Sequence, residues 1–197
     1  SVKAYFAIFT AATLLIAFNI LSQMGNVGDS LRHAAFQVAS IMTTTGFATT
    51  DFDQWPEFSR TLLVMLMFIG ACAGSTGGGI KVSRILMYMK TIKKELGILI
   101  HPRSVKIVMM DGKKLDHPVV RAANIFLISY AGILVASILL LTIDNFDFTT
   151  NVTAVISALN NIGPGLSLVG PAGNFAFFSG FSKYVLMFDM LAGRLEI

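Results

Sequence analysis

Four long stretches of this sequence contain no charged residue. One of them, residues 148–182, has too many Gly and Pro residues for a single spanning helix, and the other three are predominantly apolar. Residues 4–28, 61–80 and 122–143 span 25, 20 and 22 positions. A helix needs about 20 predominantly apolar residues to cross the hydrocarbon core of a bilayer. Charged residues make up only 13% of the 197-residue chain, against about 25% in a soluble globular domain. The sequence therefore excludes an ordinary soluble domain and predicts an all-α integral membrane protein.

The apolar segments divide into long and short ones. We expect four membrane-crossing helices and no β-sheet, with spans near residues 3–23, 58–90, 118–143 and 181–197, the second of them broken. Two further segments, at 30–42 and 149–160, are apolar but too short to cross a bilayer. We interpret them as half-helices that enter the membrane from one side only.

Most of the basic residues lie in one segment. Residues 81–121 hold ten of the fifteen Lys and Arg residues and three acidic residues, a net charge of +7. The positive-inside rule places such a loop in the cytoplasm. We therefore predict a basic cytoplasmic loop at 91–117, between a first unit at 1–90 and a second at 118–197.

The two units resemble each other as an internal repeat. An offset of 117 residues places Gly46 on Gly163, and a later offset of 123 places the Phe-Ser-Arg of 58–60 on the Phe-Ser-Lys of 181–183. Each unit reads as a span, a half-helix, a glycine-containing loop and a second span. Because each unit has two spans, the units would be parallel, related by an axis along the membrane normal.

Each half-helix is followed by a glycine-containing loop, TTTGF at 43–47 and NIGPG at 161–165. Glycine adopts positive φ at little cost, which lets successive carbonyl groups point the same way, and rings of carbonyls replace the hydration shell of a cation. A single loop of this kind is more often a simple helix-end turn, but two at equivalent positions favour an ion filter. Its candidate residues, which act through backbone carbonyls, are Thr43, Thr44, Thr45, Gly46, Phe47, Asn161, Ile162, Gly163, Pro164 and Gly165.

The second apolar stretch contains a glycine-rich break, GACAGSTGGGIK at 70–81. A phosphate-binding loop is excluded, because Ile80 separates the last glycine from Lys81 and an apolar helix precedes the loop where a strand is required. Two interpretations stay open: a close helix-packing site, for which small residues are typical in membranes, and a flexible intramembrane gate. The candidate gating residues are Gly74, Ser75, Thr76, Gly77, Gly78, Gly79, Lys81 and Arg194.

Two of the charged residues in the last expected span, Asp189 and Arg194, call for an explanation. Ionisable residues inside a membrane usually face a cavity and have a function, so Asp189 and Arg194 need partners. Arg194 would either oppose a cation in a pathway or extend its side chain to the membrane surface. The chain's one cysteine and three widely separated histidines show no metal-binding spacing, and no paired carboxylates within a span suggest an enzyme.

Four motifs together carry a family resemblance: TTTGF at 43–47, AGSTGGGIK at 73–81, NNIGPGL at 160–166 and GRLEI at 193–197. They resemble the Trk/Ktr potassium-uptake superfamily, in particular its TrkH-like membrane subunits, in which four helix–pore loop–helix repeats surround one pore. The resemblance implies that 1–90 is the third repeat and 118–197 the fourth, truncated in its inner helix. It also implies that Gly46 and Gly163 are filter glycines, that 70–81 is the gating loop and that Arg194 lies beneath the filter.

The resemblance further implies the function and the partners. The chain would be the C-terminal half of a potassium transport subunit in a bacterial or archaeal cytoplasmic (inner) membrane, multi-pass, with K⁺ as the transported ion and no covalently bound cofactor. It would work with an N-terminal half, form homodimers and bind a cytosolic nucleotide-binding ring of the TrkA type, without nucleic acid. The alternatives are a Na⁺-permeable relative, or a non-transporting membrane module that binds a cytosolic partner; such a module would need neither glycine loop.

Overall fold

The computed structural model describes residues 2–70, 75, 77–100, 109–110, 113–114 and 117–195. Helices dominate this part of the chain. They are α1 (Val2–Met24), α2 (Val27–Met42), α3 (Glu57–Met67), α4 (Val82–Ile100), α5 (His117–Leu141), α6 (Phe148–Leu159) and α7 (Gly180–Leu195), with single 3₁₀ turns at η1 (Phe52–Gln54), η2 (Thr142–Asp144) and η3 (Ser167–Val169). The expected half-helices are thus α2 and α6.

The expectation that the chain has no β-sheet is wrong. Strand β1 (Ile69–Gly70) pairs in parallel with β2 (Ile80–Lys81), and β3 (Met109–Met110) pairs antiparallel with β4 (Lys113–Lys114). Each strand has only two residues, so these ladders close loops and do not build a layer. The first of them joins the two ends of the glycine break.

Two helical stretches in the described residues, Val2–Met24 and Pro118–Asp144, are long and apolar enough to cross a membrane. Only 22% and 17% of their most apolar windows are buried, whereas a core helix of a soluble protein is mostly buried. Phe18 on α1 and Ile128 on α5, for example, are 82% and 72% exposed. A helix that is apolar all around, and whose apolar residues are not covered by the rest of the protein, is typical of a surface that faces lipid.

The second expected span is interrupted, as predicted. Helix α3 ends at Met67 and helix α4 begins at Val82, with β1 and β2 between them. Helix α4 then continues to Ile100, so residues 91–100 are helical and not part of a loop. Eight of these ten residues are Lys, Glu, Leu or Ile, most of which are good helix formers. Residues 101–108, the centre of the predicted basic loop, lie outside the described residues.

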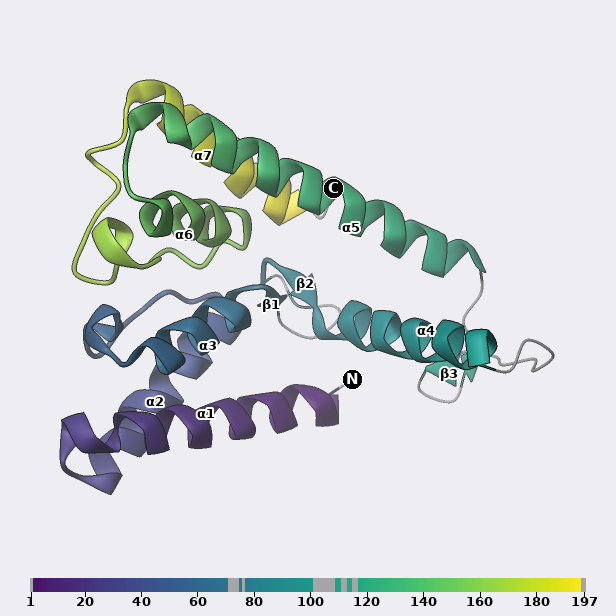
Figure 1. Cartoon of the computed structure of the whole chain (residues 1–197), viewed down its shortest axis with the longest axis horizontal. Coiled ribbons are helices and arrows are strands. Elements are labelled where there is room, and N and C mark those ends of the chain that lie inside the picture. Colours follow the sequence, from purple (N-terminus) through teal and green to yellow (C-terminus); the bar gives the residue numbers. More distant parts are fainter. Residues whose placement is uncertain are drawn as a thin grey trace.

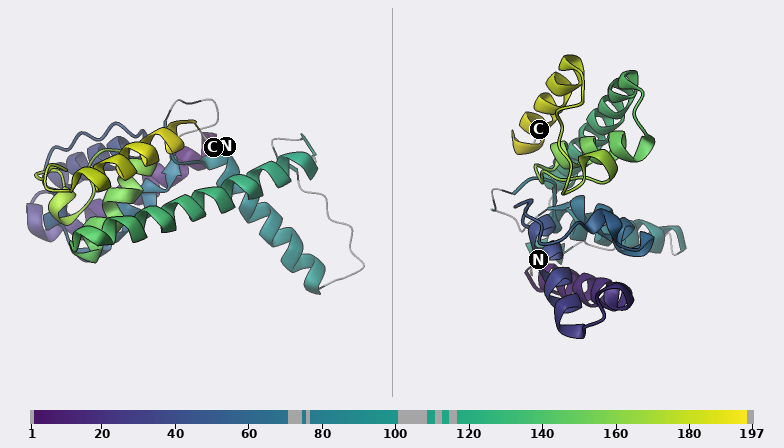
Figure 2. Two further views of the ribbon diagram at one scale, coloured as in Figure 1. Left: turned by 90° about the horizontal axis from the view of Figure 1, so that it is seen from above. Right: turned by 90° about the vertical axis from the view of Figure 1, so that its left-hand side faces the viewer.

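The helices form two similar halves (Figure 1). Helices α1–α3 make the first and α5–α7 the second, and in each the half-helix packs on the two flanking helices of its own half. Helix α4 contacts α5 near its start, where the Tyr88 hydroxyl donates to the carbonyl oxygen of Ala123 and Arg84 lies over the ring of Phe126. Its far end projects away from both halves, as the view from above shows (Figure 2). The main apolar core lies in the first half but includes Ile156, Ile162 and Leu166 from the second. The two halves therefore share buried surface.

Candidate functional site

The first candidate loop continues directly from the end of half-helix α2. The backbone N–H of Thr45 donates to the carbonyl oxygen of Ser40 (2.8 Å), and the Ser40 hydroxyl donates to the carbonyl oxygen of Phe47 (2.6 Å). Thr44 and Gly46 have positive φ, 56° and 81°. The last turn of α2 thus fixes the loop by hydrogen bonds from Ser40. Two residues in the left-handed backbone conformation, Thr44 and Gly46, reverse the chain direction within the loop.

The second loop repeats this pattern after half-helix α6. The backbone N–H of Ile162 donates to the carbonyl oxygen of Ser157 (3.0 Å), and the Ser157 hydroxyl donates to the carbonyl oxygen of Gly163 (2.7 Å). Asn161 and Gly163 have positive φ, 54° and 113°. These residues correspond to the first loop at the offset of 117 that the sequence predicted. The loops differ in the acceptor of the serine hydroxyl. The Ser40 hydroxyl donates to the carbonyl oxygen of Phe47, which corresponds to Pro164, whereas the Ser157 hydroxyl donates to that of Gly163, one residue earlier.

The two loops face each other. A Cβ added to Gly46 would overlap with the carbonyl oxygen of Ile162 and lie 3.3 Å from Cδ of Pro164. A Cβ on Gly163 would have Gly46 as its nearest neighbour, with its Cα at 4.0 Å. The structure therefore brings the two sets of candidate filter residues together, backbone against backbone.

The glycine break is closed at its base by the β1–β2 pair, in which Gly70 lies opposite Lys81. Lys81 is 4% exposed, and its Nζ donates to the carbonyl oxygens of Ser75 and Gly77, both at 2.6 Å. A buried ammonium needs such acceptors, so Lys81 holds the loop closed from within. Two candidate gating residues, Gly74 and Thr76, lie outside the described residues.

The two charged residues of α7 have different environments. The side chain of Asp189 is fully buried, and its Oδ1 accepts a hydrogen bond from the hydroxyl of Ser137 on α5 (2.6 Å). Its Oδ2 has no hydrogen-bond partner among the described residues. Arg194 lies exposed in the last turn of α7. Asp189 thus has the polar partner that we expected from the sequence, and this partner, Ser137, lies on a different helix.

A surface pocket of about 240 Å³ lies beside the first loop, between residues 48–51 and residues 171–172. Asp51 lines it, and nearby Asp53 accepts a hydrogen bond from the backbone N–H of Ser167 (3.0 Å) and pairs with Arg60 (3.1 Å). This link between the two halves was not predicted, because it joins two loops that are far apart in the sequence.

Comparisons with known proteins agree with this architecture. Residues 5–197 match the TrkH family, described as a cation transport protein. The chain is 39% identical over 189 residues to a Trk system potassium uptake protein TrkH of Salmonella typhimurium, and 44% identical over 169 residues to one of Vibrio parahaemolyticus. These alignments cover 94% and 86% of this chain, but only 39% and 34% of the relatives.

A solved structure gives the same result. The crystal structure of the potassium transporter TrkH from Vibrio parahaemolyticus matches with a TM-score of 0.90 and 40% identity, covering 99% of this chain and 42% of that one. The fold is thus an all-α membrane fold. The chain belongs to the TrkH family of cation transport proteins, and it spans about two fifths of the length of these relatives.

Proposed function

We propose that this chain forms two of the four pore repeats of a potassium uptake subunit, the third at residues 1–90 and the fourth at 118–197, joined by a cytoplasmic basic segment at 91–117. The observation that carries the proposal is the pair of facing loops. Both follow a half-helix, both have the same pattern of positive φ, and Gly46 lies against the carbonyl of Ile162. Backbone carbonyls in such a paired arrangement are suited to replace the hydration shell of K⁺.

The route of the ion follows from this assignment. K⁺ would pass the carbonyls of residues 43–47 and 161–165, and the break at 70–81 would close the pathway on the cytoplasmic side. Arg194, at the end of α7, would raise the energy of a cation near the break by charge repulsion. The permeation is facilitated transport through a filter, with no covalent chemistry, and K⁺ is the cargo.

The membrane setting and the partners belong to the same proposal. The chain would lie as a multi-pass protein in a bacterial or archaeal cytoplasmic membrane, with its basic segment inside. The pore would be completed by two further repeats in an N-terminal half. Full-length subunits would form homodimers and bind a cytosolic nucleotide-binding ring of the TrkA type, for which the cytoplasmic basic segment and α4 offer a surface.

The test uses a complete pore. This chain replaces the matching 42% of the Vibrio parahaemolyticus transporter, and the product, called here the joined subunit, is expressed in cells that lack their own potassium-uptake systems. We expect growth at low external K⁺ and uptake of rubidium, a K⁺ substitute. A joined subunit that reaches the membrane in normal amount but restores neither would contradict the proposed function.

A further inference from the structure

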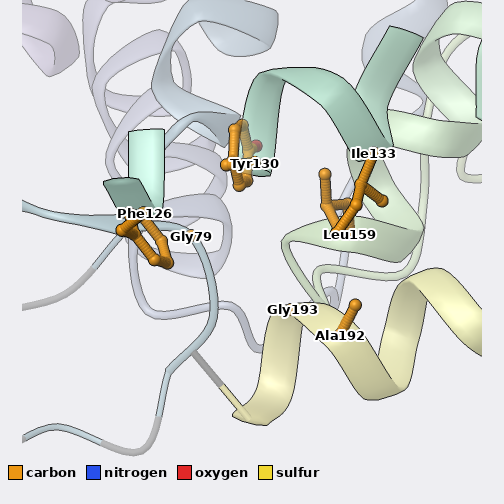
Figure 3. Close-up of a pocket in the computed structure, with 7 residues that line it drawn as sticks. All are labelled: Gly79, Phe126, Tyr130, Ile133, Leu159, Ala192 and Gly193. Atoms are coloured by element: carbon orange, nitrogen blue, oxygen red, sulfur yellow. The ribbon is translucent and has the colours of Figure 1, made fainter. Parts of the chain in front are cut away.

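Three segments meet at the carboxyl end of half-helix α6. They are the glycine break with Gly78 and Gly79, helix α5 with Tyr130, and helix α7 with Gly193. Figure 3 shows Gly79, Tyr130 and Gly193 around a small cavity of about 10 Å³, which is room for about one water molecule. The end of the half-helix is thus enclosed by elements from both halves of the chain.

Two of the glycines touch the end of α6 with bare backbone. A Cβ added to Gly78 would overlap with the carbonyl oxygen of Asn160, and one added to Gly193 would overlap with that of Leu159. No other residue type allows backbones to approach so closely. The break therefore lies directly against the carbonyl group of Asn160, which caps the half-helix, and helix α7 lies against that of Leu159.

The side chain of Asn160 is held in one position. It is fully buried, its Oδ1 accepts a hydrogen bond from the hydroxyl of Tyr130 (2.9 Å), and its Nδ2 donates to the carbonyl oxygen of Ile156 (2.7 Å). A Cβ added to Gly79 would lie 3.1 Å from the same Oδ1. Because the next residue, Asn161, begins the second candidate filter loop, Asn160 stands between that loop and the break.

We infer that Asn160 is a positioning residue of the gate: it is the seat on which Gly78 and Gly79 rest when the pathway is closed, and Tyr130 fixes this seat. The inference rests on the proposed function, because it assigns a closing contact to the break. Closure then depends on a glycine at position 78, since any side chain there must lift the break off Asn160. The contact between Gly78 and the carbonyl group of Asn160 is one of backbone packing and involves no charged group.

The experiment compares two glycine substitutions in the joined subunit. Gly78→Ala places a methyl group against Asn160, whereas Gly132→Ala on α5 meets no atom within 4 Å and is the matched control. We expect Gly78→Ala to raise rubidium uptake roughly 5- to 10-fold, as overpacking of one methyl group can shift a two-state equilibrium by such a factor. The K⁺/Na⁺ permeability ratio should stay unchanged, because the filter loops are not altered.

A second pair of variants tests the seat itself. Tyr130→Phe removes only the hydroxyl that fixes Asn160, and Tyr184→Phe removes a hydroxyl from an exposed position on α7. We expect a smaller rise in uptake for Tyr130→Phe and none for Tyr184→Phe. Uptake in Gly78→Ala equal to that in Gly132→Ala would overturn the inference. So would a rise accompanied by loss of the K⁺/Na⁺ ratio, which would mean that the contact shapes the filter.

A measurement without transport separates this inference from the proposed function. In a background with Cys72→Ser, the half-buried Ile80 of the break is replaced by cysteine, and its labelling by a water-soluble maleimide is followed in the purified joined subunit. We expect faster labelling when Gly78→Ala is added than when Gly132→Ala is added. Equal rates would contradict the seat, whether or not the joined subunit carries rubidium.

Discussion

Gly46 lies directly against the carbonyl group of Ile162, so the two candidate filter loops touch through their backbones. Gly46 has a φ of 81°, a conformation that costs other residues about 1–2 kcal/mol. The position therefore needs glycine twice, once for the backbone angle and once for the space. A substitution that moves the backbone of one loop must therefore also displace the backbone of the other.

The first prediction concerns the gate. In the joined subunit, deletion of one glycine from residues 77–79 shortens the glycine break, which is proposed to close the pathway. Arg194→Ala removes a cation that repels K⁺. We expect each change to raise rubidium uptake. If the break and the arginine act as one gate, the double variant should show less than the sum of the two effects in free energy. Uptake at the unchanged level in all three variants, at normal expression, would mean that the glycine break serves helix packing.

The second prediction concerns the buried pair of Ser137 and Asp189. Ser137→Ala leaves Oδ1 of Asp189 without its donor, beside an Oδ2 that has no partner among the described residues. We expect a loss of about 1–2 kcal/mol in stability, measured as the unfolding temperature in detergent. Asp189→Asn keeps an acceptor oxygen and should lose less.

The matched control for this pair is Thr13→Val on α1. Its hydroxyl is buried and has no hydrogen-bond partner among the described residues, so its removal should cost much less than Ser137→Ala. Equal losses for the two variants would show that the serine–aspartate hydrogen bond contributes nothing particular to the packing of α5 on α7.

The third prediction concerns Asp147, which caps half-helix α6. Its carboxylate accepts hydrogen bonds from the hydroxyl (2.5 Å) and the backbone N–H (2.9 Å) of Thr150, and these bonds lower the pKa of Asp147. A carboxyl whose pKa is lower in the folded state stabilises the fold above its unfolded pKa, about 3.9, and loses this contribution as the pH falls through the folded value.

We therefore expect Asp147→Ala to cost about 1 kcal/mol at neutral pH. The difference in unfolding temperature between the unchanged protein and the variant should shrink as the pH is lowered below about 4. A difference that is the same at pH 3 and pH 7 would mean that the cap does not depend on the carboxylate charge.

The fourth prediction concerns orientation in the membrane. Met109 in the basic segment is 55% exposed. Ala172, in the pocket beside the first candidate filter loop, is exposed as well. In a Cys72→Ser background, a single cysteine at 172 should react with an impermeant maleimide added to whole cells. A cysteine at 109 should react only after the cells are opened. The reverse pattern would refute the proposed topology.

The long helices and the repeat could be predicted from the sequence because both depend on local patterns. Helices α1 and α5 follow the charge-free windows, and the offset of 117 reappears in the hydrogen bonds of Ser40 and Ser157. The interruption of the second span was also predicted, since three successive glycines do not favour a helix.

The features that could not be predicted are contacts between segments that come together only in the folded chain. The β1–β2 pair has two residues in each strand, too few for any periodicity to show. The contact of Gly78 with Asn160 joins segments that are far apart in the sequence, and the glycine itself gives no indication of its neighbour. Helix α4 extends to Ile100 because helix formers continue past the apolar stretch, where the charge count indicated a loop.

The most direct test of the account is the K⁺/Na⁺ permeability ratio of the joined subunit with Gly46→Ser, Gly163→Ser or the control Gly132→Ala. A side chain strains the backbone at both filter positions, where φ is 81° and 113°. At Gly46 it also meets the carbonyl oxygen of Ile162. We predict that both serine variants lower the ratio, Gly46→Ser more than Gly163→Ser, and that the control keeps it. Unchanged ratios in both serine variants would contradict the claim that these loops form the filter.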